Sequence, residues 1–133
     1  MTTLGIRSTL PPELDALVTE TIGALLVVHR ELGSGMSESV YSAAACLELA
    51  ERRIPFETEK ILPVRYRGKF LCHQRVDLFV DGRLVVEIKS VERLHPVHVA
   101  QVVSYLRLSG VRVGLLVNFN VAMLKQGIRR IVL

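Results

Sequence analysis

Residues 60–91 read KILPVRYRGKFLCHQRVDLFVDGRLVVEIKSV, and from Leu62 to Tyr66 every second side chain is apolar. A period of two is typical of strands. Gly68 and the pair Asp81-Gly82 interrupt the stretch where tight turns are expected. The segment therefore predicts an antiparallel meander of three consecutive strands, at about Lys60–Arg67, Lys69–Val80 and Arg83–Val91.

Two helices are predicted before this meander. Pro11 and Pro12 suit a helix start, and Gly33 ends the apolar helical pattern that follows them. Ser37 suits the N-cap of a second helix, at about Glu38–Arg53. The apolar stripe expected on this second helix consists of Val40, Ala44 and Leu47.

A helix and one or two strands are predicted after the meander. Pro96 and Gly110 suit the start and the end of the helix, which leads into the nearly all-apolar run Val111–Asn118. A strand–helix–strand crossover of this kind favours parallel pairing. Residues Ile128–Leu133 suit a last edge strand. The predicted fold class is α/β, with a mixed sheet flanked by helices.

The length of 133 residues predicts a single domain, residues 1–133. The longest apolar run, Ile22–Val28, has seven residues, far below the roughly 20 that a membrane-spanning helix needs. Residues 1–7 carry no readable secretory signal, so we expect no membrane association and a cytoplasmic location. Cys46 and Cys72 are too few for a four-thiolate zinc site or an iron–sulfur cluster.

Seventeen basic against thirteen acidic side chains give a net charge of +4, which suits a polyanionic partner such as nucleic acid. Basic residues gather in the first hairpin of the meander, at Arg65, Arg67, Lys69 and Arg75. They either protect an exposed sheet edge against aggregation or meet phosphates, and both interpretations stay open at this stage. The small size and the mean hydropathy of +0.36 also leave a homodimer open.

Three charged side chains stand in the otherwise apolar strands of the meander. Asp77 precedes Glu87 by ten residues, and Lys89 follows Glu87 by two, on the same face of its strand. Ions on a mostly apolar surface need partners. One or two carboxylates bind a hard cation such as Mg²⁺ together with water and phosphate oxygens, and a nearby ammonium orients or helps to deprotonate an attacking water.

The register of the hairpin decides whether Asp77 and Glu87 share a face. A two-residue loop, Asp81-Gly82, pairs residues whose numbers sum to 163 and separates the carboxylates. A three-residue loop, Val80–Gly82, gives a sum of 162 and makes the carboxylates diagonal neighbours on one face. We predict the second register, or another even sum produced by a bulge.

The predicted helices supply further polar groups. Glu38 falls in the first turn of the second helix, with Tyr41 one turn later on the same face. Gln101 and Tyr105 lie four residues apart on the third helix, with His98 one turn earlier. A stripe of this kind suits contact with a phosphate or a base edge.

These residues together resemble the signature of the PD-(D/E)XK nuclease superfamily, which Asp77 and Glu87-Ile88-Lys89 match. The spacing Gln101-x-x-x-Tyr105 is similar to the motif of its RecB and Cas4-like branch. The segment Gly35-x-x-Glu38-x-x-Tyr41 is similar to the one that names the small GxxExxY protein family within that superfamily. The resemblance covers roughly residues 25–133 and includes Gly114–Phe119.

The resemblance implies a restriction-endonuclease-like αβββαβ core and divalent-metal-dependent phosphodiester hydrolysis, with DNA or a related nucleic acid as substrate. Asp77 and Glu87 would hold Mg²⁺ or Mn²⁺, Lys89 would act on the nucleophilic water, and Glu38 would assist or add a ligand from its helix. The groups that would orient the substrate are Gln101, Tyr105 and Tyr41. Val76 stands where the superfamily name has proline, and the lack of a cysteine cluster excludes the iron–sulfur variants of the RecB-like branch.

Each of these residues also has a purely structural interpretation. The charges at Asp77, Glu87 and Lys89 would form an ion-pair ladder, in which each pair contributes about 0.2–1 kcal/mol. Glu38 would favour its helix through the dipole, by about 0.3–1 kcal/mol, and Gln101 and Tyr105 would be an ordinary helix-surface pair. The corresponding alternative function is a non-catalytic nucleic-acid- or protein-binding module on the same fold.

Overall fold

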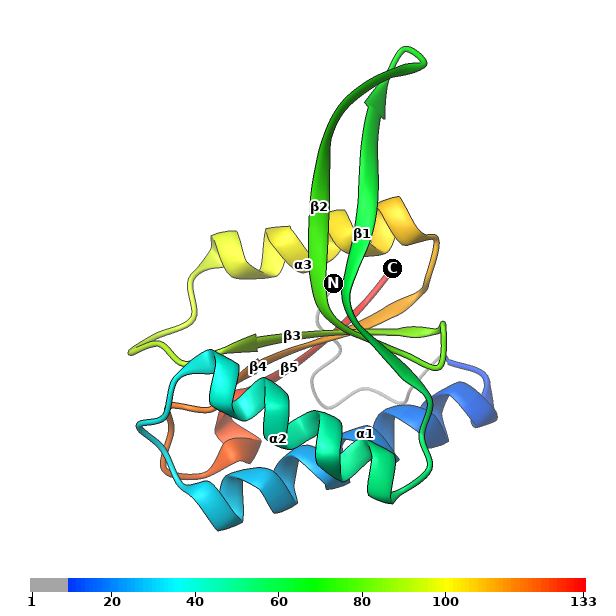
Figure 1. Cartoon of the computed structure of the whole chain (residues 1–133). Helices are drawn as coiled ribbons and strands as arrows, with labels where there is room; N and C mark the ends of the chain where they lie inside the picture. Colours follow the sequence, from blue (N-terminus) through cyan, green and yellow to red (C-terminus); the bar gives the residue numbers. More distant parts are fainter. Residues whose placement is uncertain (1–9) are drawn as a thin grey trace.

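The computed structural model describes residues 10–133 and has one five-stranded mixed sheet with helices on both faces (Figure 1). The strand order is β1-β2-β3-β4-β5. The first nine residues, where the sequence predicts no secretory signal, lie outside the described residues. In chain order the elements are α1 (Pro12–Leu32), α2 (Glu38–Glu51), β1 (Phe56–Tyr66), β2 (Lys69–Val80), β3 (Leu84–Lys89), α3 (Pro96–Ser109), β4 (Val113–Asn118), the 3₁₀ helix η1 (Leu124–Gly127) and β5 (Ile128–Val132).

The predicted α/β class and mixed sheet are confirmed. Strand β4 pairs parallel with β3 and antiparallel with β5, which is the predicted edge strand. Strand β1 begins at Phe56, four residues before the predicted start, because the intervening residues Glu57–Glu59 have exposed side chains and give no alternating pattern. No helix within residues 10–133 is both long and apolar enough to cross a membrane.

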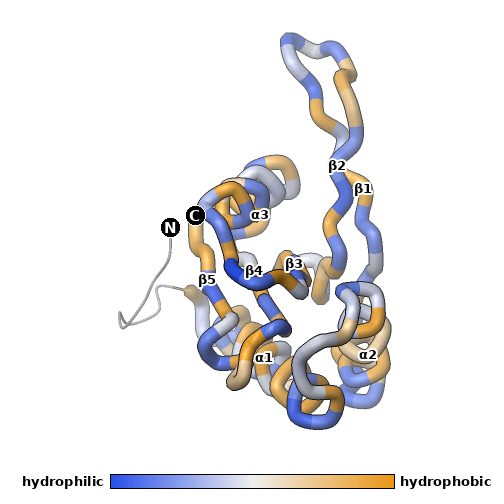
Figure 2. Tube along the Cα trace, turned by 90° about the vertical axis from the view of Figure 1, so that its left-hand side faces the viewer, coloured by the Kyte–Doolittle hydropathy of each residue, from blue (hydrophilic) through white to orange (hydrophobic). Residues whose placement is uncertain are grey.

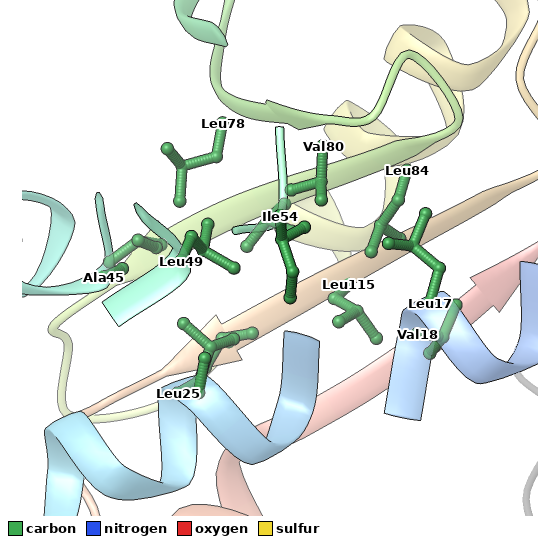
Figure 3. Packing of buried hydrophobic residues seen from close by; sticks show 14 of the residues in the cluster. Leu17, Val18, Leu25, Ala45, Leu49, Ile54, Leu78, Val80, Leu84 and Leu115 are labelled. Carbon is green, nitrogen blue, oxygen red and sulfur yellow. The ribbon is translucent and has the colours of Figure 1, made fainter. Parts of the chain in front are cut away.

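Two apolar layers hold the helices to the sheet. Helices α1 and α2 pack on one face through a core that includes Leu25, Leu49, Leu78 and Leu115 (Figure 3). Helix α3 covers the opposite face through a smaller cluster that contains Val102 and other side chains. Figure 2 shows the two helical layers on either side of the strands. The polar residues of β3 that alternate with its core residues therefore face the α3 side.

The buried face of α2 differs from the predicted stripe. Its buried residues are Tyr41, Ala45 and Leu49. Of the predicted stripe, Ala44 is partly buried against the core, whereas Val40 and Leu47 are 41% and 75% exposed. The sequence of α2 is apolar around more than one side, so helical periodicity alone does not select the side that packs. Tyr41 decides it, since its ring stacks on Phe119 with centroids 4.4 Å apart.

The β1–β2 hairpin leaves the sheet and projects from the body of the protein (Figures 1 and 2). Pairing between β2 and β3 covers only Leu78–Val80 of β2, but pairing between β1 and β2 continues to the turn at Arg67-Gly68. Both turn residues have positive φ, 52° and 75°, as a type I′ turn requires. The distal half of the hairpin is therefore a two-stranded ribbon with no third strand beside it.

The predicted hairpin register is correct in parity but wrong in detail. Val80 pairs with Leu84 and Leu78 with Val86, so paired numbers sum to 164 and not to 162. The loop is shifted because Asp81 takes a positive φ of 50° and its carboxylate accepts a 2.7 Å ion-paired hydrogen bond from Arg83. The sum is still even, so Asp77 and Glu87 lie on the same face.

Gly114 of β4 allows the close approach of α3. A Cβ atom at this position would lie 2.7 Å from Cγ1 of Val102. We expect Gly114→Ala to lower the free energy of unfolding by about 1–3 kcal/mol because the packed helix must shift. Urea denaturation measures the change.

The matched control is Gly23→Ala in α1, where the nearest atom is the end of the flexible Arg52 side chain, 3.1 Å away. Alanine favours the helix by about 0.4–1 kcal/mol over glycine. This variant should be neutral or stabilised. Equal destabilisation of both variants would contradict the assigned packing.

Candidate active site

Asp77 and Glu87 meet where the β2–β3 ladder ends. Leu78 and Val86 form the last backbone pair, and one residue further the two carboxylates take over as hydrogen-bond acceptors. Oδ2 of Asp77 accepts a 2.9 Å hydrogen bond from the backbone N–H of Ile88, and Oε1 of Glu87 lies 3.5 Å from the backbone nitrogen of Asp77. The side chains thus fill the gap between the diverging strands and are fixed by the backbone.

Both carboxyl groups resist ionisation. Burial, followed by the negative charge of Asp77, raises the pKa of Glu87 to about 8. Burial also raises the pKa of Asp77, although the hydrogen bond from Ile88 and the charge of Lys89 oppose the rise. Glu87 is only 4% exposed. In the absence of a cation, Glu87 therefore keeps its proton at neutral pH, and a positive charge placed beside the pair would favour ionisation of both groups.

Lys89 and Tyr105 approach this pair from the α3 side. Nζ of Lys89 lies 3.6 Å from Oε2 of Glu87, and its side chain is 17% exposed. Burial and the charges of Glu87 and Asp77 raise the pKa of Tyr105 to about 12, although a hydrogen bond with Gln101 opposes the rise. An ion-pair ladder accounts for the contact between Lys89 and Glu87. It does not account for the half-buried carboxyl group of Asp77, which faces the buried carboxyl group of Glu87.

Glu38 lies near the pair but has its own partner. Its Oε2 accepts a 3.2 Å hydrogen bond from the backbone N–H of Ser90, directly after β3. The Ser90 hydroxyl in turn donates to the carbonyl of Met36 at 2.7 Å. The charge of Glu38 contributes to the raised pKa of Asp77. Glu38 thus ties the start of α2 to the end of β3, beside the carboxylate pair.

Tyr41 does not occupy the substrate-facing position expected for it. The side chain is fully buried, and its hydroxyl donates to the carbonyl of Gly33 at 2.5 Å and accepts from the N–H of Met36 at 3.2 Å. Both partners belong to the loop between α1 and α2. Tyr41 therefore shapes the loop that precedes Glu38. Of Glu38 and Tyr41, which the sequence places on one face of α2, only Glu38 is exposed.

Asn118 is a structural support that no sequence pattern singled out. Its side-chain amide donates to the carbonyl of Val91 at 2.9 Å, and its Oδ1 accepts from the N–H of Val91 at 3.0 Å. It thus continues the β3–β4 ladder beyond Lys89. A buried asparagine at the end of the apolar run of β4 is the only signal that the sequence offers for this role.

Two hollows open on either side of the carboxylate pair. The α2 pocket has a volume of about 500 Å³ and contains Asp77 and Glu38. The hairpin–α3 groove has a volume of about 760 Å³ and is lined by Val64, Gln74, Lys89, Val97, His98, Ala100, Gln101, Ser104, Tyr105, Arg107 and Leu108. Gln101 and Tyr105 thus face the same hollow as Lys89.

The donor set fits a hard divalent cation on two carboxylates. Among residues 10–133, no group of three or more histidine, cysteine, aspartate or glutamate side chains is placed to hold a metal ion, so Glu38 does not complete a three-residue cluster. Mg²⁺ usually keeps several waters and needs only one or two carboxylates, and Mn²⁺ accepts the same ligands. The raised pKa values of Asp77 and Glu87 mark the place where such a charge would be stabilising.

The pKa of Glu87 predicts a specific pH dependence of stability. The unfolded carboxyl group releases its proton near pH 4.5, but the folded group keeps its proton until about pH 8. The free energy of unfolding must therefore fall as the pH rises through this interval. Relative to Glu87→Gln, the protein should lose about 1–4 kcal/mol between pH 5 and 8 in chelator, since one pKa unit corresponds to about 1.4 kcal/mol.

Urea denaturation of both proteins at several pH values measures this difference. Glu20→Gln changes an exposed glutamate of α1 and should follow the unsubstituted protein. Parallel profiles for the Glu87→Gln variant and the unsubstituted protein would show that Glu87 ionises normally in the folded state.

Comparison with known proteins gives one family match. The family model described as the PD-(D/E)XK nuclease superfamily matches residues 15–131, which include every element except the first three residues of α1 and the last residue of β5. No curated protein and no solved structure match the chain. The matched region contains Asp77, Glu87 and Lys89, which lie where β2 and β3 cease to pair. The chain belongs to the PD-(D/E)XK nuclease superfamily.

Proposed function

We propose that the protein is a metal-dependent nuclease that hydrolyses phosphodiester bonds of DNA or a related nucleic acid. The observation that carries this proposal is the close approach of two carboxyl groups, the buried Glu87 and the half-buried Asp77, beside Lys89. Ionisation of both groups at this distance is costly to the fold, because Glu87 is buried and Lys89 is its only cationic partner within residues 10–133. A bound cation would offset this cost, because it would stabilise both groups in the ionised form.

The proposed cofactor is Mg²⁺ or Mn²⁺, held by Asp77 and Glu87. Such a cation would lower the pKa of a bound water and stabilise the charge that develops on the phosphate. The Lys89 ammonium lies on the open side of the pair, in the hairpin–α3 groove, where it would orient the attacking water and stabilise negative charge. Glu38 would assist from the α2 pocket.

Tyr105 and Gln101 are proposed to orient the substrate. With a pKa of about 12, the Tyr105 hydroxyl stays protonated at neutral pH and remains a hydrogen-bond donor. Its hydrogen bond with Gln101 couples the two side chains along one face of α3. This arrangement supports placing the protein in the RecB and Cas4-like branch of the superfamily.

The test is cleavage of single- and double-stranded DNA and RNA by the purified protein in Mg²⁺, Mn²⁺ or chelator. We expect metal-dependent cleavage that falls by about 100-fold or more in Asp77→Asn, Glu87→Gln and Lys89→Ala, because each removes a group at the reacting centre. Glu20→Gln should retain full activity. Mn²⁺ should also raise the melting temperature of the protein, and this shift should vanish in the Asp77→Asn/Glu87→Gln double variant.

Cleavage that persists in Glu87→Gln would place the activity at another centre or in a contaminant. A protein that neither cuts any of these substrates nor gains stability with Mn²⁺ would contradict the nuclease proposal. Salt-sensitive binding without cleavage would then favour the binding-module alternative.

A further inference from the structure

The excess positive charge of the protein is confined to the distal β1–β2 hairpin. Residues 60–76 contain five of the seventeen basic side chains and no acidic one. The rest of the chain has the remaining twelve basic side chains against thirteen acidic ones. The body of the protein is thus nearly neutral, and the hairpin that projects from it is cationic (Figure 1).

The cations near the turn of this hairpin are unpaired. Lys60 and Arg75 lie closer to the body and have glutamate partners at 3.6 Å and 3.5 Å. Among the described residues, Arg65, Arg67 and Lys69 have no acidic partner, and all three are exposed. The guanidinium of Arg67 lies over the ring of Tyr66, 5.6 Å from its centroid. Exposed cations without an acidic partner are available for phosphate groups.

Exposed aromatic rings neighbour these cations: Tyr66 lies between Arg65 and Arg67 and pairs across the ribbon with Lys69, and Phe70 pairs with Arg65. Tyr66 is 63% exposed and Phe70 is 51% exposed, and the neighbouring Leu71 is 60% exposed. Protection of the ribbon edge against aggregation explains the charges but not these rings, because exposed aromatic groups on an edge promote association. Cations interleaved with aromatic faces are what an unpaired nucleic-acid strand requires, since its bases stack on rings while its phosphates meet cations.

The hairpin–α3 groove connects this surface with the carboxylate pair. Val64 and Gln74 of the hairpin form one wall, and Ser104 and Arg107 of α3 belong to the other. No acidic side chain lines the groove, and Lys89 stands beside Glu87 at its inner end. A polyanion would therefore meet only neutral or positive groups between the hairpin and the site.

We propose that the distal hairpin and the hairpin–α3 groove bind single-stranded nucleic acid and lead it to Asp77 and Glu87. The delivery of the strand to Asp77 and Glu87 rests on the proposed nuclease function. The binding of the strand to the hairpin does not. A single strand fits better than a duplex, because the faces of paired bases are hidden in the stack and cannot reach Tyr66 or Phe70.

The test is a binding assay in chelator, where no cleavage occurs. Fluorescence anisotropy of a labelled probe measures the affinity. The probes are a labelled oligothymidine of about 16 nucleotides and a duplex of the same length. The triple variant Arg65→Ala/Arg67→Ala/Lys69→Ala should bind the single strand at least about tenfold more weakly near 0.1 M salt. Its slope of log affinity against log salt should be smaller by about 2, because each lost phosphate contact contributes about 0.7 for a single strand.

The matched control removes three exposed cations elsewhere, in Arg30→Ala/Arg112→Ala/Lys125→Ala. It has the same net charge as the hairpin variant and should keep its affinity within about threefold and its salt slope within about 0.5. Tyr66→Ser should weaken single-strand binding by about fivefold or more through lost stacking. All substituted side chains are exposed, and circular dichroism checks that each variant is folded.

Equal loss of affinity in the hairpin and control triple variants would overturn the proposal, since net charge alone would then explain binding. Tighter binding of the duplex than of the single strand would also overturn it. If the hairpin variant binds and cuts like the unsubstituted protein, the inference fails and the nuclease proposal stands. If the protein binds single strands through the hairpin but cuts nothing in Mg²⁺ or Mn²⁺, the inference stands and the nuclease proposal fails.

Discussion

The repulsion between two carboxylates at the end of the β2–β3 ladder is the constraint on which the rest of the site depends. The backbone places Asp77 and Glu87 against each other, with a hydrogen bond from Ile88 to Asp77, so neither side chain can relax into water without breaking local structure. Lys89 offsets part of the negative charge from the same strand. Glu38 and Asn118 then fix the segment after β3, through Ser90 and Val91, and keep this arrangement rigid.

The sequence predicted the fold and the charged centre because both depend on local periodicity. Alternation along β3 places Glu87 and Lys89 on one face, and an even hairpin register adds Asp77 to it. The predicted sum of paired residue numbers was too low by two, because the backbone conformation of Asp81 determines which residues form the loop. Such a choice depends on the left-handed backbone of Asp81 and Gly82 and on the contact of Asp81 with Arg83, which no hydrophobic pattern reports.

Other features depend on tertiary contacts between residues far apart in the chain. The packed side of α2 follows from the stacking of Tyr41 on Phe119, 78 residues away in the sequence, so a helical pattern alone placed the stripe wrongly and gave Tyr41 an exposed role. The support by Asn118 and the hydrogen bond between Glu38 and Ser90 are likewise contacts across the fold. The hairpin projects because β2 pairs with β3 only over Leu78–Val80. The amino-acid composition of the hairpin does not indicate where this pairing stops.

The early parting of β2 from β3 also sets the mechanical character of the projecting ribbon. An isolated two-stranded ribbon is only marginally stable, and segments with few buried contacts open locally at low free-energy cost. The carboxylate centre sits at the foot of this ribbon, inside the cooperative core, while the tip lies outside it. The protein thus joins a stiff carboxylate centre to a compliant arm, so that fluctuations at the tip need not disturb the groups below.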